Sequence, residues 1–287
     1  MDKALYAVVM EAYTGGISTR KVDALVEALG GDSGISKSEV SRICQGLDEQ
    51  VKAFLGRPLE HVHFPYVYLD ATYLHGRLGR NLQVVSRAVV VAIGINALGY
   101  REVLGIAVGD SEAEAFWRQF LGSLKERGLT GTRLVISDAH LGLTAAIKRM
   151  FQGSSWQRVT AMLAKQFPKA VPGMVAARDD VLAFLHFPQE HWRKIWSTNP
   201  LERLNVGPRG ALGSAVIKRR TNVVGIFPND AAIVRLVGIQ LLEQQEEWQL
   251  ERRRFFSEAT MAKPPQPEEL LGLTDGDPAE QAAVAVS

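Results

Sequence analysis

The stretch 66–73, YVYLDATY, and the stretch 133–138, RLVISD, decide the fold of this sequence. Both are dominated by apolar, β-branched and aromatic residues, a composition typical of strands. Each also holds one carboxylate, Asp70 inside the first and Asp138 at the end of the second. Because an acid in an apolar strand is costly unless it is compensated, each is expected either to bind a metal ion or to accept hydrogen bonds as a structural residue.

The residues around these two stretches predict an alternation of strands and helices. Ser111 and Glu114 match a capping box that opens one of the helices. Strands are predicted at 66–73, 82–95, 102–108 and 133–137, and helices at 111–127 and 141–150. The first three strands form an antiparallel meander. Three strands, a helix, a strand and a helix are the opening of an RNase H-like domain of mixed α/β class, which we assign to residues 65–157.

In that arrangement the first and fourth strands are neighbours, so Asp70 and Asp138 are expected to meet at one spot. Ligands commonly sit at the carboxyl ends of such strands, and a hard cation with oxygen ligands relieves the repulsion between two carboxylates. Glu202, in WSTNPLERLN, is predicted on the first turn of a helix and is a third candidate. A surface Glu paired with Arg203 or Lys194 is the alternative. Two bridged metal ions would activate a water or a 3′-hydroxyl for phosphoryl displacement.

Other residues give weaker signals. His140 lies close to Asp138 and is either a metal or phosphate contact or a capping residue. His61 and His63 are spaced to face one side of an extended segment but have no third ligand. Cys44 is the only cysteine, which excludes a disulfide framework and a cysteine-based zinc site.

Helical regions flank the core. Residues 1–58 predict three short helices, the last running from the capping box Ser36–Glu39 to about Leu55, and together they suggest a helix-turn-helix that binds DNA. A plain helical bundle is the alternative. Residues 158–262 are predicted to be mostly helical, with a long last helix at 230–256, and the Pro- and Glu-rich tail 263–287 to be disordered.

The charge is unevenly distributed. The net charge is +2, but without the acidic tail 263–287 the body holds 32 basic and 26 acidic residues. The segment Arg193–Arg220 contains a single acid, Glu202. This pattern favours a polyanionic partner, although a solvated basic face is the alternative. No apolar run is long enough to span a membrane, and no signal peptide is evident, so a cytoplasmic protein is expected.

Five long stretches resemble the Mutator-type transposases of bacterial insertion sequences. They are YVYLDATY, REVLGIAVGDSEAEAFWRQFL, LVISDAHLGL, STNPLERLN and IKRRTNVVGIFPND, and the resemblance runs from about Lys3 to Lys263. It implies an RNase H-like domain with an Asp-Asp-Glu triad that uses two Mg²⁺ or Mn²⁺ ions, here Asp70, Asp138 and Glu202.

The same resemblance implies partners and a location. Its substrates are the terminal inverted repeats of the element and the target DNA, bound by a homo-oligomer associated with the nucleoid, with no role for a membrane. The basic residues expected to contact DNA are Lys37, Arg42, Arg203, Lys218, Arg219 and Arg220.

The sequence departs from the family pattern in three places. Family members usually begin well before Met1, so part of the DNA-binding region is expected to be absent. After Gln157 the chain jumps to RVTAMLAKQFPKA, which predicts that the fifth strand and part of a helical insertion are deleted. The insert VGPRGALGSA follows Asn205 and should interrupt the helix that carries Glu202. We therefore expect weak catalysis from this copy.

Two other functions stay open on the sequence alone. One is a non-catalytic DNA-binding protein or regulator, derived from a transposase, that uses residues 1–58. The other is a different RNase H-like nuclease, such as a junction resolvase, which the length of the matching stretches disfavours. Mg²⁺-dependent cleavage of the element's own ends separates the first of these from an active transposase.

Overall fold

A computed structural model describes a mixed α/β protein, as the sequence predicts. The described residues are 37–79, 81–110, 113–138, 141–151, 155–159, 183–195, 221 and 224–263. The predicted first two helices of the helix-turn-helix, the Glu202 helix with residues 196–220 of the basic segment, and the tail beyond Lys263 lie outside them. No described helix has the length and apolarity needed to cross a membrane.

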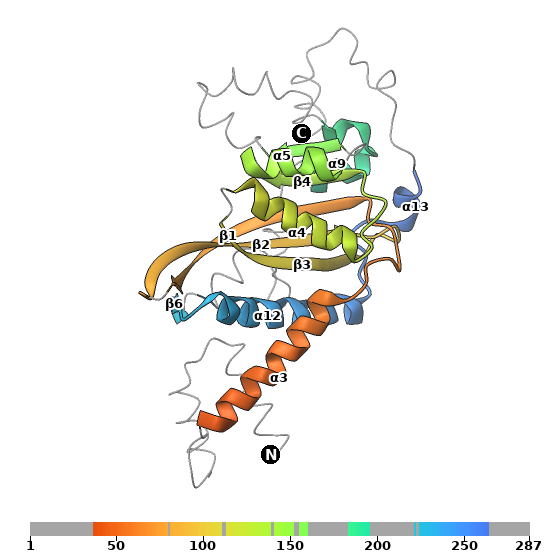
Figure 1. The fold of residues 1–287 in the computed structure, drawn as a ribbon. Helices are drawn as coiled ribbons and strands as arrows, with labels where there is room; N and C mark the ends of the chain where they lie inside the picture. Colours follow the sequence, from red (N-terminus) through yellow and green to blue (C-terminus); the bar gives the residue numbers. More distant parts are fainter. Residues whose placement is uncertain are drawn as a thin grey trace.

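A mixed sheet forms the centre of the molecule (Figure 1). Its strands are β1 (Tyr66–Leu78), β2 (Gln83–Ile95), β3 (Arg101–Gly109), β4 (Leu134–Asp138), β5 (Ser155–Val159) and β6 (Ile226–Phe227). The order is β3-β2-β1-β4-β5, with β6 beside the outer part of β1. The predicted antiparallel meander is confirmed, and β4 and β5 continue it in parallel orientation.

The fifth strand is present, which corrects the prediction that it was deleted. β5 pairs with β4 from Leu134–Ser155 to Asp138–Val159. Residues from Arg158 onward have helical periodicity, but the open edge of β4 offers hydrogen bonds to Arg158 and Val159 that the local sequence does not reveal. The strand bearing Asp138 is therefore supported on both edges.

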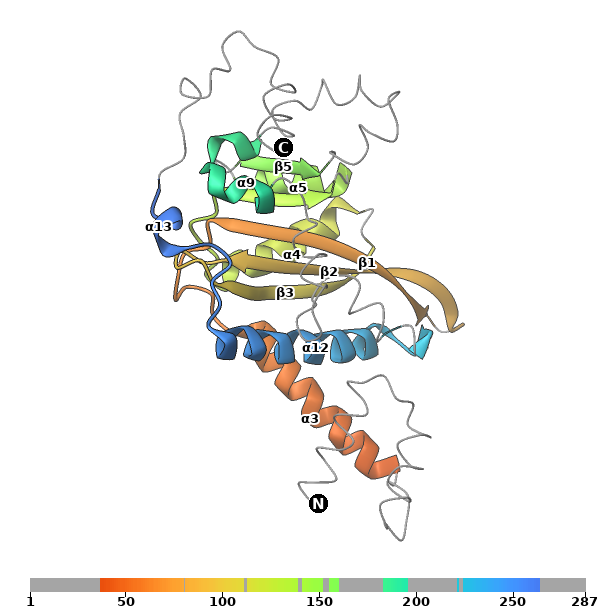
Figure 2. The same cartoon turned by 180° about the vertical axis from the view of Figure 1, so that it is seen from behind.

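The helices lie in a layer on each face of the sheet (Figure 2). They are α3 (Lys37–Gly56), α4 (Glu114–Glu126), α5 (Leu141–Met150), α9 (Gln189–Ile195), α12 (Asp230–Glu251) and α13 (Glu258–Met261), with a short 3-10 turn at Ala183–His186. One face is covered by α4 and α5, which bury Trp117, Leu121 and Ile147. The other is covered by α12 and the 183–195 segment, and α3 packs on α12 through Val51 against Gly238.

A bulge in β3 explains several buried polar side chains. The register shifts after Ala92, so Leu104 has no partner on β2. Gln245 of α12 accepts a hydrogen bond from the freed Val103 N–H at 2.7 Å. Arg127 donates to the Leu104 carbonyl at 2.8 Å, and Arg57 donates to that of Val103. Side chains thus satisfy the backbone groups that the bulge removes from the ladder.

Two helix ends differ from the predictions. The N-cap of α4 is Ala113 and makes no side-chain cap bond, so the expected capping box at Ser111 and Glu114 does not start this helix. The long helix ends at Glu251, where Arg252 adopts a left-handed conformation, and not near Phe256. The chain then folds back, and the amides of Phe255 and Phe256 donate to the Gly99 carbonyl at 2.7 and 3.2 Å.

Candidate active site beside Asp70 and Asp138

Asp70 and Asp138 lie on neighbouring parallel strands. The pairing of β1 with β4 runs from Tyr66–Leu134 to Leu69–Ser137, and the next residue on each strand is the aspartate. Residues at matched positions of parallel strands share a face of the sheet. The predicted adjacency of the two strands is therefore confirmed, while the distance between the two carboxylates stays a prediction, because the Asp138 side chain is outside the described part.

The neighbours of Asp70 along its face of β1 are buried. Asp70 is half-buried, and Tyr68, two residues earlier on the same face, is fully buried. Thr72, two residues later, is 3% exposed, and its hydroxyl has no hydrogen-bond partner in the described structure. An orphaned buried hydroxyl next to a carboxylate fits a site that takes up a polar ligand.

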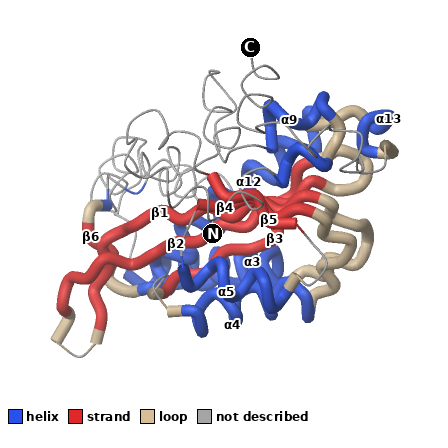
Figure 3. Tube along the Cα trace, turned by 90° about the horizontal axis from the view of Figure 1, so that it is seen from above, coloured by secondary structure: helices blue, strands red, loops and turns tan. Residues whose placement is uncertain are grey.

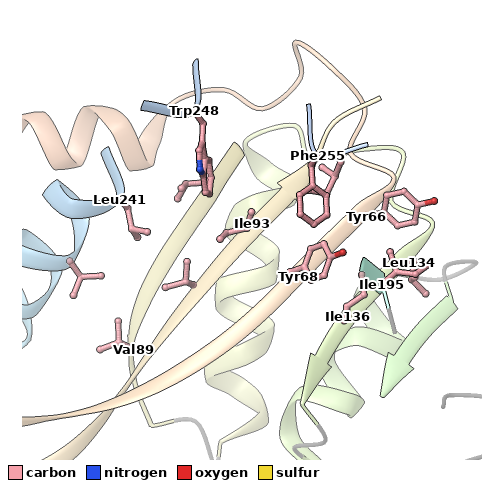
Figure 4. Packing of buried hydrophobic residues seen from close by; sticks show 14 of the residues in the cluster. Tyr66, Tyr68, Val89, Ile93, Leu134, Ile136, Ile195, Leu241, Trp248 and Phe255 are labelled. Atoms are coloured by element: carbon pink, nitrogen blue, oxygen red, sulfur yellow. The ribbon is translucent and has the colours of Figure 1, made fainter. Parts of the chain in front are cut away.

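The segment that leads to Glu202 is fixed against this face. The Tyr68 hydroxyl donates to the Lys194 carbonyl at 2.8 Å, and Ile195, the last residue of α9, is completely buried. Figure 4 shows Tyr68, Ile195 and Phe255 gathered over the same part of the sheet. Glu202 lies seven residues further along and outside the described residues, so its place relative to Asp70 stays a prediction.

Lys194 has a structural role that its charge does not suggest. Its ammonium donates to the Phe255 carbonyl and lies 4.7 Å from the centre of the Phe255 ring. Burial lowers the pKa of Lys194, and the nearby Arg101 and Arg253 lower it further. Lys194 is thus engaged inside the protein. Its charge is therefore not available to the basic segment Arg193–Arg220 that the sequence predicts.

His191 links α9, β1 and α13. Its Nδ1 is 2.7 Å from the Tyr66 hydroxyl, and its Nε2 is 2.8 Å from Thr260 Oγ1. Burial lowers the pKa of His191 to about 4, so the ring is neutral near pH 7. Since the Thr260 hydroxyl donates to the Ser257 carbonyl, the network is satisfied when Tyr66 donates to Nδ1 and Nε2–H donates to Thr260.

This packing arrangement was only partly foreseen. The sequence predicts that His186 and His191 pack among Phe184, Phe187 and Trp192. His191 does pack in an aromatic cluster, but its stacking partner is Phe256, with ring centroids 3.9 Å apart. The alternating tyrosines of YVYLD are the only sequence signal for the two hydroxyls that hold α9, and strand propensity alone explains them equally well.

The two weaker histidine candidates that the structure describes, His61 and His63, do not form a shared metal site. His61 lies 3.1 Å from Glu102 and His63 2.9 Å from Thr130, so these two histidines have separate partners. Within the described residues no group of three or more His, Cys, Asp or Glu side chains could hold a metal ion. Arg42 is exposed on α3. The side chains of Lys37, His140, Arg203, Lys218, Arg219 and Arg220 lie outside the described part.

Comparison with known proteins identifies the family. A family model described as "Transposase, Mutator family" matches residues 1–164 and 158–251. The chain belongs to the Mutator family of transposases. The two matched segments meet at residues 158–164, next to the position where the sequence departs from the family pattern.

Individual relatives are named as insertion-sequence transposases. The transposase for insertion sequence element IS1081 of Mycobacterium tuberculosis is 39% identical over 298 residues, which cover 89% of this chain and 69% of the relative. The transposase for IS256 in transposon Tn4001 of Staphylococcus aureus is 33% identical, covering 89% and 74%. That for ISRM5 of Rhizobium meliloti is 34% identical, covering 89% and 72%.

The alignments also bear on the internal deletion. The aligned stretch of 298 residues is longer than the whole chain of 287, although only 89% of the chain takes part. The IS1081 relative therefore has residues within the aligned stretch that this chain lacks. The chain is shorter than its relative inside the matched region, yet it retains β5.

Proposed function

We propose that this chain is a DNA transposase that cleaves and joins DNA strands for an insertion sequence, with Asp70, Asp138 and Glu202 as its catalytic carboxylates. The observation that carries the proposal is the position of Asp70 and Asp138 directly after the Leu69–Ser137 pair of two parallel strands. The strand order β3-β2-β1-β4-β5, with helices on both faces, agrees with an RNase H-like core.

The residues at this position fit a divalent cation. Carboxylate oxygens are the ligands that Mg²⁺ and Mn²⁺ prefer, and the orphaned Thr72 hydroxyl beside Asp70 offers a polar partner for a metal-bound water. Asp70 and Asp138 would hold the ions, with Glu202 as the third donor. The two ions, when bound, supply the activated nucleophile and stabilise the departing oxygen in phosphoryl transfer.

The protein's own residues orient this site. β1 is paired with β2 at Asp70 itself and with β4 up to Leu69, directly before Asp70, which limits the movement of its carboxylate. The bond from Tyr68 to Lys194 fixes the end of α9, from which the chain runs toward Glu202. The aromatic and aliphatic side chains around Tyr68 keep this side of the site dry, which strengthens its electrostatic interactions.

The proposed partner is duplex DNA, including the terminal inverted repeats of the element and a target site, bound by a homo-oligomer in the cytoplasm. The charge that supports this is the body of 32 basic and 26 acidic residues. Lys37, Arg42, Arg203, Lys218, Arg219 and Arg220 are the proposed phosphate contacts. Binding through such contacts weakens steeply as salt rises.

A non-catalytic DNA-binding role is the second candidate. The insert VGPRGALGSA, between Asn205 and Val216, favours it because glycine and proline interrupt a helix that must hold Glu202 in place. In this case the chain would bind the element's ends without cutting them.

The test compares cleavage by the chain and by Asp138→Ala. The substrate is a duplex carrying the inverted repeats found beside the gene, with Mn²⁺ as the metal. Cleavage that the substitution abolishes supports the transposase. Salt-dependent binding without any cleavage, in both proteins, supports the non-catalytic role instead.

A further inference from the structure

The hairpin formed by β1 and β2 extends beyond the rest of the sheet. β3 pairs with β2 only between Ala88 and Ile95, whereas the pairing of β1 with β2 continues outward to Leu78–Gln83. Figure 3 shows this part projecting past α4 and α5. We call residues 73–87 the hairpin arm. The sequence predicts a strand that ends at Tyr73, so the length of the arm was not foreseen.

One face of the hairpin arm is anchored to the body. Leu74 is 5% exposed, and Gly76 lies so close to Ile233 of α12 that a Cβ would be 3.4 Å from its Cδ1. Arg87 makes a bidentate ion pair with Asp230 at the start of α12, at 3.0 and 2.6 Å. These contacts hold the arm in a defined position.

The opposite face is open to solvent and carries no acid. Tyr73 is 52% exposed and Val84 46% exposed, and His75, Arg77 and Ser86 are exposed beside them. We call these five residues the outer face of the arm. The sequence 73–87, YLHGRLGRNLQVVSR, holds no aspartate or glutamate, and its outer face carries Arg77 and His75. An exposed face with an arginine, a histidine and an aromatic side chain, and without an acid, is complementary to a nucleic acid backbone.

The strand β6 supports the arm from its other edge. β6 pairs with β1 at His75–Ile226 and Gly76–Phe227. The arm is thus held in place by β6 as well as by α12.

We propose that the outer face of the hairpin arm binds the phosphate backbone of duplex DNA. The proposal rests on the proposed function, since it takes DNA as the substrate of the chain. Arg77 is seven residues beyond Asp70 on β1, about 23 Å at ~3.3 Å per residue, and this odd spacing places the two side chains on opposite faces of the sheet. The contact at the arm is therefore separate from the site at Asp70.

A binding measurement tests whether the outer face of the arm contributes to the affinity for DNA. Fluorescence anisotropy with a random 30-base-pair duplex, at rising salt, compares the full chain with the double variant His75→Ala/Arg77→Ala. The variant should bind ~3–10-fold more weakly at low salt, and its log–log salt slope should fall by about one. Arg254→Ala removes one charge at the other end of the sheet, where Arg254 pairs with Glu258, and should leave the slope unchanged.

Cross-linking tests the location. In a Cys44→Ser background, Arg77→Cys and Arg254→Cys each carry a photo-crosslinker, with thermal unfolding as the check of folding. Position 77 should cross-link to the duplex and position 254 should not. The proposal is overturned if the chain binds the duplex, the double variant shows the same salt slope, and position 77 does not cross-link to the duplex.

The other outcomes are also decisive. The edge of β2 at residues 83–87 is not paired with β3, so a second copy of the chain is the rival occupant. A cross-link from position 77 to another copy overturns the DNA proposal. Arm-dependent binding without Mn²⁺-dependent cleavage supports the arm while contradicting the transposase activity, and no duplex binding at any salt contradicts both.

Discussion

Asp70 and Asp138 each follow directly on a paired residue, Leu69 and Ser137, of two neighbouring parallel strands. The two acids are far apart in the sequence, and their strands are neighbours because the chain returns through α4 to place β4 beside β1. β4 is in turn paired with β5 up to Asp138–Val159. The candidate site is therefore built on strands with partners on both edges, and the loss of residues after Gln157 has not removed that support.

Gly99→Ala should strongly destabilise the fold. Gly99 has φ +84°, and a Cβ there would be 2.1 Å from the Phe256 carbonyl oxygen. The Gly99 carbonyl also accepts hydrogen bonds from the amides of Phe255 and Phe256, so the two segments cannot move apart without losing them. Gly79→Ala is the matched control, because Gly79 has φ +72° with nothing within 4 Å. Urea unfolding should give a cost of about 1–2 kcal/mol for Gly79→Ala, from the left-handed backbone alone, and more for Gly99→Ala. Equal costs would contradict the backbone clash.

The stability of the protein should fall as the pH drops from about 6.5 to about 4. The folded state holds the pKa of His191 at about 4, below its ordinary 6.5, so in this window the unfolded chain takes up a proton that the folded chain does not. The stabilisation is fully present above pH 6.5 and is lost as the pH falls through this range, by up to about 3 kcal/mol at ~1.4 kcal/mol per pKa unit.

The check is urea unfolding at several pH values with His191→Gln as the control. The glutamine can hydrogen-bond Tyr66 or Thr260 but does not titrate. Its stability should therefore change less between pH 6.5 and pH 4 than that of the unsubstituted chain. The same pH dependence in both proteins would show that other groups cause it.

Much of the fold could be predicted from the sequence because its elements have strong local signals. The apolar runs of β2 and β4, and the helix Leu141–Met150, lie where their periodicity predicts. The misses share a cause. Three segments form strands only because another strand offers an edge: β5, the outer part of β1, and β6. In the sequence alone, Gly76, Gly79 and the charged residues around them resemble a loop.

The candidate site was predictable only in part. Asp70 and Asp138 stand out because each is an acid in an apolar strand, and the order of elements is enough to bring the strands together. The roles of Tyr68 and His191 were not predictable, because each depends on a partner more than a hundred residues away in the chain. Glu202 has no such signal, since an acid among arginines is equally typical of a surface ion pair.

Removal of the insert should raise catalytic activity. With β5 present, the insert 206–215 is the departure from the family pattern that lies nearest to Glu202, since it follows directly on the segment bearing this residue. A deletion that joins Asn205 to Val216 should increase Mn²⁺-dependent cleavage about 10-fold or more, because small misplacements of catalytic groups cost up to ~10²-fold in rate. Nicking of supercoiled plasmid is the measurement, and an unchanged or lower rate would show that the insert is harmless.

Mn²⁺ binding tests the central claim most directly. Electron paramagnetic resonance of free Mn²⁺, with the full chain and a random duplex, would compare Asp70→Asn and Asp138→Asn with Glu126→Gln, which removes an exposed carboxylate on α4. If Asp70 and Asp138 share the ion, each Asp variant should bind Mn²⁺ more than about 10-fold more weakly, since each removes one of few charged ligands, while Glu126→Gln binds as the unsubstituted chain does. Equal Mn²⁺ affinity in all four proteins would contradict the account.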